Sequence, residues 1–187
     1  FRVAIAEQLE DPAEAKKRGS KSVVKRDIVR LVTPGTLTED NLLDARSHNF
    51  LASVARSKAT GEAAIAWADI SSGEFAVMHT AASRLAADLM RLEPREIIVA
   101  EGLVADPSFS SLFDRTAVPV TPLPAARFDS LGAERRLKDW FDVAALDGFG
   151  SFSRAEISAL GGLLEYIVVT QAGRLPHLRP PRRDLPS

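Results

Sequence analysis

The sequence contains no cysteine, which removes several kinds of chemistry at once. Disulfide bonds, thiolate nucleophiles and cysteine-ligated zinc are excluded. A chain without cysteine is typical of an intracellular protein, so we expect a cytoplasmic location. The sequence also lacks an apolar run long enough to span a membrane, and residues 1–10 lack the basic start and apolar core of a signal peptide.

The chain also has little excess charge and no phosphate-binding loop. Its formal net charge is −1, whereas a self-sufficient nucleic-acid binder usually carries a clear basic excess. Residues 71–73 form a Ser-Ser-Gly turn without the lysine of a P-loop, and residues 148–150 lack the further glycine of a dinucleotide fingerprint. His48, His79 and His177 are far apart in the sequence. We therefore expect no cofactor or metal site in this chain.

What is present is a succession of short strand and helix patterns. Alternating or continuous apolar runs predict strands over residues 1–8, 22–33, 49–57, 63–70, 74–80, 96–100 and 118–120. Capping residues and helical spacing predict helices over residues 11–18, 39–45, 83–92, 107–114, 131–141 and 153–172. The strand over 22–33 is expected to carry a bulge near residues 26–27.

The helix over 153–172 has the clearest signals. Ser153 and Glu156 have the spacing of a capping box, and Gly173 is placed to end the helix. Gly161 and Gly162 lie in its middle, where each glycine costs about 1 kcal/mol relative to alanine. This pair predicts a close contact between the helix and a neighbouring element.

The order of these elements indicates an α/β fold with a mixed sheet. The strands over residues 49–80 are joined by short turns, which predicts an antiparallel meander. Residues 96–100 are apolar on both faces, as in a buried parallel strand, and Pro119 confines the next strand to a sheet edge. A meander followed by alternating helices and strands matches the ribonuclease H-like architecture.

That architecture raises one catalytic alternative, a metal-dependent nuclease. Such nucleases hold two metal ions about 4 Å apart between carboxylates. The candidate acids are Asp69 on the second meander strand, Asp88 on the following helix and Glu101 after the buried strand. In the non-catalytic interpretation, Asp69 starts a turn, Asp88 lies on a solvated helix face and Glu101 ends a strand. We favour this interpretation because the first meander strand, where such a nuclease needs an acid, has none.

Two groups of basic residues are candidates for binding. Lys16, Lys17, Lys21 and Lys25 precede or begin the second strand and could contact DNA phosphates, although acidic neighbours dilute their charge. The second group is a basic stripe on the helix over 131–141, which is a docking surface in one interpretation and a solvated helix face in the other. Its members are Arg135, Arg136 and Lys138.

Several strings together resemble the bacterial MutS family of DNA mismatch repair sensors. Glu-Gln-Leu-Glu-Asp-Pro at residues 7–12 and Val-Thr-Pro-Gly-Thr at residues 32–36 resemble the end of its mismatch-binding domain. Matching segments then follow in order for the link, the connector domain and the beginning of the lever domain, at residues 40–43, 49–52, 69–75, 94–98, 161–166, 170–171 and 175–178.

This resemblance implies a domain division. Residues 1–36 would be the C-terminal part of the α/β mismatch-binding domain, residues 37–48 a linker, residues 49–172 the connector domain and residues 173–187 the start of the lever. Both ends look like the interior of a longer chain. The family's mismatch-reading Phe-x-Glu motif and its ATPase site, which uses ATP and magnesium, are expected outside this chain, so the chain itself is expected to carry no active site.

The resemblance also implies partners. The family binds mismatched double-stranded DNA, and its connector couples the DNA-reading end to the lever and clamp. The connector offers a docking face to the partner protein MutL, for which Arg135, Arg136 and Lys138 are the candidates here. Homodimerisation is expected through domains outside this chain, and the location implied is bacterial and nucleoid-associated.

Overall fold

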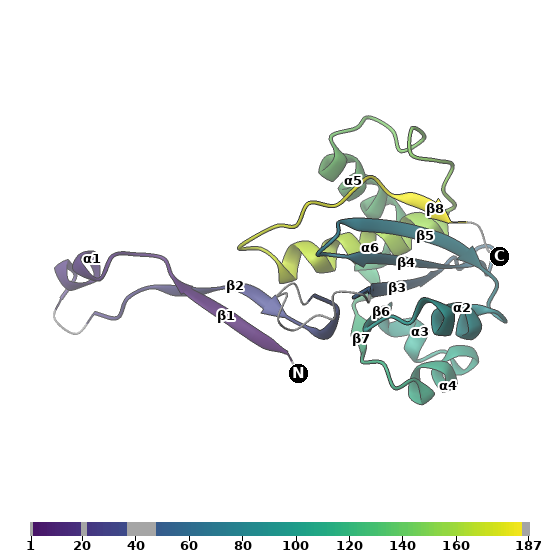
Figure 1. Ribbon diagram of the computed structural model, residues 1–187, viewed down its shortest axis with the longest axis horizontal. Helices are drawn as coiled ribbons and strands as arrows, with labels where there is room; N and C mark the ends of the chain where they lie inside the picture. The colour runs from purple at the N-terminus through teal and green to yellow at the C-terminus, as the bar shows by residue number, and fades with distance from the viewer. Residues whose placement is uncertain (1, 20–21, 37–47, 185–187) are drawn as a thin grey trace.

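The computed structural model describes residues 2–19, 22–36 and 48–184. Figure 1 shows two parts: a long two-stranded ribbon that projects to one side, and a body built on a six-stranded sheet. The expected helix over 39–45 lies outside the described residues. No helix among the described residues combines the length and the apolar character needed to cross a membrane.

The ribbon pairs β1 (Val3–Gln8) with β2 (Arg26–Val32) in antiparallel fashion, and α1 (Pro12–Lys17) lies at its far end. Asp11 caps α1 by accepting a hydrogen bond from the Ala13 N–H at 2.7 Å, as its position before a proline predicts. The pairing register shifts where Ile5 faces Arg30 and Ala6 faces Ile28. The bulged residue is therefore Val29, and the prediction of a bulge near residues 26–27 was wrong by about two residues.

The body's sheet has the order β7-β6-β3-β4-β5-β8. The meander of β3, β4 and β5 is confirmed as antiparallel, β6 is parallel to β3, and β7 lies at an edge. Residues 173–187 were expected only to start the lever, but they include β8, which pairs parallel to β5. The strands are β3 (Leu51–Arg56), β4 (Ala63–Asp69), β5 (Glu74–Thr80), β6 (Glu96–Ala100), β7 (Val120–Leu123) and β8 (Arg182–Asp184).

Helices cover both faces of this sheet (Figure 1). The helices α5 (Ser130–Phe141) and α6 (Arg154–Thr170) share one apolar core with it. The helices α2 (Leu85–Leu92), α3 (Glu101–Val104) and α4 (Pro107–Arg115) share the second core on the other side. Two short 3-10 helices, η1 (Pro34–Thr36) and η3 (Ala125–Phe128), complete the body.

The long helix α6 is fixed as its sequence predicts. The Ser153 N–H donates to Glu156 Oε2 at 2.6 Å and the Glu156 N–H donates to Ser153 Oγ at 3.2 Å, which confirms the capping box. A Cβ added at Gly161 would lie 2.2 Å from the Cβ of Ala133 on α5. The predicted close contact is thus a helix–helix crossing that only glycine permits.

Candidate coupling site at the base of the ribbon

A buried carboxylate joins the ribbon to the body. Glu96 begins β6 and is 1% exposed. Its Oε2 accepts a hydrogen bond from the Gly35 N–H of η1 at 3.0 Å. Its Oε1 accepts hydrogen bonds from Thr121 Oγ1 of β7 at 3.1 Å and from the Tyr166 hydroxyl of α6 at 2.7 Å. Donors from three separate elements therefore satisfy one buried acid, which makes this arrangement far stronger than a surface contact.

The donors around Glu96 are themselves held in place. Arg2, just before β1, donates from Nη2 to Thr121 Oγ1 at 2.6 Å, so the ribbon contacts this network from a second position. Burial, together with the negative charge of Glu96 and the hydrogen bond to it, raises the pKa of Tyr166 above its ordinary value of 10.0. The neutral hydroxyl is thereby kept as a donor to the carboxylate.

The turn that follows β2 fits tightly against the sheet. A Cβ added at Gly35 would lie 2.8 Å from Leu51 Cδ1 and 3.0 Å from the Glu96 Cβ, so no larger residue fits without a shift. Asn49 Nδ2 donates to the Pro34 carbonyl at 3.1 Å, and the Thr33 N–H donates to Thr36 Oγ1 at 2.8 Å. The Pro-Gly-Thr string thus forms the seat of the ribbon on the body.

A second attachment connects β2 to the end of α6. Gln171 accepts a hydrogen bond from Arg30 Nε at 3.2 Å and donates to the Leu31 carbonyl at 3.4 Å. The Gly173 N–H donates to the Val29 carbonyl at 2.5 Å. Because Val29 is the bulged residue with no partner in β1, its carbonyl is available to the body. Sequence reasoning assigned Gly173 only to helix termination and missed this contact.

The expected DNA-contacting lysines lie far from this junction. Lys16 and Lys17 are exposed on α1, at the end of the ribbon remote from the body (Figure 1), and Lys25 is exposed before β2. Lys21 lies outside the described residues. Glu10 receives an ion pair from Arg18 and a hydrogen bond from the Lys25 N–H at 2.6 Å, so an acid is built into this basic end.

The three residues of the expected docking stripe differ in their surroundings. Arg135 is exposed and makes no ion pair with a described residue. Arg136 is half-buried, pairs with Glu165 of α6 at 3.3 Å and donates to the Arg127 carbonyl at 2.6 Å. Its side chain therefore does not point fully into solvent, in contrast to the expected basic stripe. Lys138 pairs with Glu134 at 2.7 Å, and this hydrogen bond holds the pKa of Glu134 below its usual range.

The nuclease alternative is not supported by where its acids lie. Asp69 accepts from the Ser71 N–H at 2.9 Å and so starts a turn, as the non-catalytic interpretation has it. Asp88 is only 3% exposed and accepts from Thr80 Oγ1 at 2.6 Å, so its expected place on a solvated face was wrong. The sequence around Asp88 did not indicate that Thr80, at the end of β5, would donate a hydrogen bond to its carboxylate.

The sheet register also separates these acids. Leu51 is paired with both Ala68 and Glu96, so Asp69 lies at the end of the sheet where β6 begins. Glu101 starts α3 beyond the opposite end of β6, roughly 15 Å away at about 3.3 Å per residue. Two shared metal ions need far closer carboxylates. Across residues 2–19, 22–36 and 48–184, no group of three or more acidic or histidine side chains could hold a metal ion.

The fold and its junction define a class: an α/β body carrying a projecting ribbon that is bonded to it through a buried acid. Comparison with known proteins is consistent with the two parts, because residues 49–179 match the family model described as MutS domain II and residues 1–41 match MutS domain I. The chain belongs to the MutS family, as the sequence strings indicated.

Curated relatives extend this assignment over nearly the whole chain. A protein of Ruegeria sp. (strain TM1040) named "DNA mismatch repair protein MutS" is 60% identical over 184 residues, which covers 98% of this chain and 21% of the relative. A protein of the same name from Cereibacter sphaeroides is 56% identical over 185 residues, covering 99% of this chain and 20% of the relative. The chain therefore spans about a fifth of the length of these relatives.

Proposed function

We propose that this chain is the connector module of a DNA mismatch repair sensor, together with the adjoining end of its mismatch-binding domain. The family assignment and the names of the relatives support this proposal. The proposed domains are residues 1–36, a linker over 37–48, the connector over 49–172 and the start of the lever over 173–187. The ATP and magnesium site, the mispair-reading residues and the homodimer contacts belong to parts of the full-length protein outside this chain.

The proposed connector is ribonuclease H-like in its strand arrangement and works without an active site of its own. The order β5-β4-β3-β6-β7, with an antiparallel meander leading into parallel strands, supports the first point. The absence of an active site is inferred from the separate hydrogen-bond partners of Asp69 and Asp88 and from the position of Glu101 beyond the opposite end of β6. The module acts by position, within a full-length protein that we place in the bacterial cytoplasm on the nucleoid.

The observation that carries the coupling role is the hydrogen bonding of Glu96. A shift of η1 would remove the Gly35 N–H from Oε2 of a buried carboxylate, and leaving a buried acceptor atom without its donor costs about 1–3 kcal/mol. A movement of the ribbon on DNA is therefore transmitted to β6 and, through Tyr166, to α6. The Gln171 and Gly173 contacts carry the same movement to the segment that leads toward the lever.

A test of this coupling uses Glu96→Gln in the full-length protein, with Glu62→Gln in an exposed loop as the matched control. The measurements are affinity for a mismatched duplex and the stimulation of ATP hydrolysis by mismatched over matched duplex. We expect mismatch affinity to change little and the stimulation of ATP hydrolysis to fall about fivefold or more. A roughly fivefold factor lies at the lower end of typical coupling between two sites. Unchanged stimulation in Glu96→Gln would contradict the proposal.

We also propose that the exposed end of α5 docks MutL. Arg135 is exposed there next to Leu131, which is 61% exposed, whereas Arg136 pairs with Glu165 of α6 and Lys138 pairs with Glu134 within α5. Because this chain has no native cysteine, Arg135→Cys adds one thiol to it for a crosslinking probe, and the unsubstituted full-length protein measures crosslinking from any thiol outside this chain. With ATP-loaded full-length protein we expect crosslinks to MutL from this position and none from Lys58→Cys. Equal yields from both positions would contradict the proposed face.

Lys16, Lys17, Lys21 and Lys25 are proposed to contact the DNA backbone without reading sequence. The position of α1 at the far end of the ribbon supports this role. Replacing Lys16 and Lys17 by glutamine in the full-length protein should weaken binding to matched and mismatched duplex equally. Because each lost lysine–phosphate ion pair reduces the slope of log affinity against log salt concentration by about one, loss of both pairs should reduce it by about two. A loss confined to mismatched duplex would assign these residues to mispair reading instead.

A further inference from the structure

A large groove lies on the face of the sheet opposite to α5 and α6. It runs between α2 and α4 and has a volume of about 1220 Å³. Its floor is apolar and belongs to the second core, with Phe50, Leu89, Ile97 and Phe113 all buried. None of the coupling or docking residues described above lines it, so the groove is separate from both proposed roles.

Apolar side chains are exposed at the rim of this groove. Met90 on α2 is 78% exposed, which is unusual for a large apolar residue. Leu92 and Val118 are half-buried beside it, and Leu112 lies across the groove on α4. A flexible thioether at the edge of an apolar groove suits a surface that adapts to a partner's side chains.

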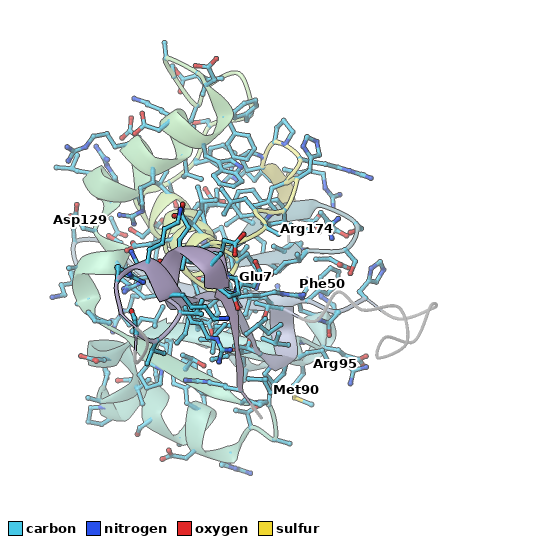
Figure 2. All side chains as sticks on the ribbon, turned by 90° about the vertical axis from the view of Figure 1, so that its left-hand side faces the viewer. Glu7, Phe50, Met90, Arg95, Asp129 and Arg174 are labelled. Atoms are coloured by element: carbon cyan, nitrogen blue, oxygen red, sulfur yellow. The ribbon has the colours of Figure 1, made fainter. Side chains whose placement is uncertain are left out.

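The charge around the groove is predominantly positive. Arg95, just before β6, and Arg115, at the end of α4, both line the groove and are exposed, and neither makes an ion pair with a described residue. Met90 and Arg95 lie close together on the same side of the molecule (Figure 2). Arg91 is engaged with Asp88 at 3.7 Å, and Glu93 is the one acid among the described residues that line the groove. A ligand that fits must therefore combine an apolar strip with negative charge at its margins.

Size points to a helix of a partner protein. The groove exceeds the roughly 300–1,000 Å³ of most small-molecule pockets. Its walls are helices of 8 and 9 residues, so it extends about 12–14 Å at 1.5 Å per residue, or a little over two helical turns. That length accepts apolar anchors at positions i, i+3, i+4 and i+7 of one amphipathic helix.

We infer that the α2–α4 groove docks an acidic amphipathic helix from another protein. Its apolar strip packs between Met90 and Leu112, and its carboxylates pair with Arg95 and Arg115. A second copy of this chain fits poorly, because a two-fold contact would bring the same two arginines of each copy together. Single-stranded nucleic acid fits poorly as well, because the phenylalanine rings of the groove are buried in its floor, and the exposed His48 ring is already stacked on Phe50 with one of its faces.

The test measures binding of a fluorescent designed peptide to the full chain by anisotropy. The peptide carries leucines at i, i+3, i+4 and i+7 with glutamates flanking them, and a matched peptide carries lysines in place of the glutamates. We expect the acidic peptide to bind at least tenfold tighter than the basic one. The double variant Arg95→Glu, Arg115→Glu should reverse this preference, and Met90→Asp should weaken both peptides. Lys58→Glu, in an exposed loop outside the groove, is the control and should change neither affinity.

Amide spectra of the labelled chain keep the outcomes distinct. Shifts confined to α2, α4 and the residue 93–97 segment, with all variants folded, support the inference. Equal binding of the two peptides, or no binding of either, would overturn it. Concentration-dependent dimerisation that Met90→Asp abolishes would assign the groove to a second copy instead, and displacement of the acidic peptide by single-stranded DNA would assign it to nucleic acid.

Discussion

The ribbon and the body are stabilised in different ways. Every residue of β4 is buried in the body, whereas β1 is almost entirely exposed. Among the described residues up to 32, Ala15 is the one that is buried. An isolated two-stranded ribbon is marginal in water, so the ribbon's position depends on its seat on the body. The body has apolar cores of its own on both sides of the sheet.

The largest expected effect distinguishes the two regions by truncating one apolar side chain in each. Leu160 of α6 is fully buried, and Leu160→Ala should lower the free energy of unfolding by about 2–5 kcal/mol. Ile28 of β2 is 60% exposed, and Ile28→Ala should change it by less than about 0.5 kcal/mol. Urea denaturation of the two variants measures both values. A comparable loss from Ile28→Ala would show that the ribbon has a core of its own.

A smaller effect is expected at the crossing of α5 and α6. Gly161→Ala would place a methyl group 2.2 Å from the Ala133 Cβ, and such overpacking costs about 1–3 kcal/mol. Gly102 of α3 is the matched control, because an added Cβ meets nothing within 4 Å there. Gly102→Ala should be neutral or stabilising by up to about 1 kcal/mol, since alanine favours helix. Thermal unfolding of both variants provides the measurement, and equal midpoints would contradict the tight crossing.

The smallest effect compares one kind of helix cap in the two regions. Asp106 caps α4 and Asp11 caps α1, each by accepting from a backbone N–H two residues on. The hydrogen bond from the Ser108 N–H holds the pKa of Asp106 below its ordinary value of 3.8. Its contribution to stability is therefore present above pH 3.8 and is lost as the pH falls through the lower, folded-state pKa.

Asp106→Asn keeps a capping side chain but removes this titration. The variant should match the parent chain near neutral pH and lose less stability below pH 3.8, as measured by urea midpoints across the acid range. Asp11→Asn should leave the midpoint of the body unchanged at every pH, because α1 lies on the ribbon. If Asp106→Asn and the parent chain lost stability identically in acid, the titration of Asp106 would make no contribution to the acid unfolding of the body.

Much of the body could be predicted because local signals and packing agree there. The capping box at Ser153 and the apolar run of β6 each act through the backbone nearby, and both elements formed where expected. The edge strand expected over residues 118–120 formed two to three residues later, as β7 at Val120–Leu123. The glycine pair in α6 even predicted a close crossing. Residues 182–184 were missed as a strand because Pro180 and Pro181 suggested an irregular exit, and only the free edge of β5 makes it a strand.

The candidate coupling site could not be predicted in the same way. Glu96 looks like an ordinary charged residue at the start of a strand, and its donors come from residues 35, 121 and 166. Those separations in sequence are closed only by the sheet order and by the register of β6 against β3. A buried acid is recognisable once the fold is known, because an unpaired one would be too costly to keep.

The most direct test of the Glu96 junction is a titration of Tyr166. It is the one tyrosine in the chain, so the near-ultraviolet absorbance of tyrosinate reports on it alone. Because its pKa is raised in the folded chain, its contribution to stability is fully present below pH 10.0 and should be lost as the pH rises through the higher, folded-state pKa. We predict that Tyr166 stays protonated past pH 10.0 while the chain is folded, and that Glu96→Gln moves its ionisation back toward that value. Ionisation of the folded parent chain at pH 10.0, unchanged by Glu96→Gln, would contradict a closed junction between the ribbon and the body.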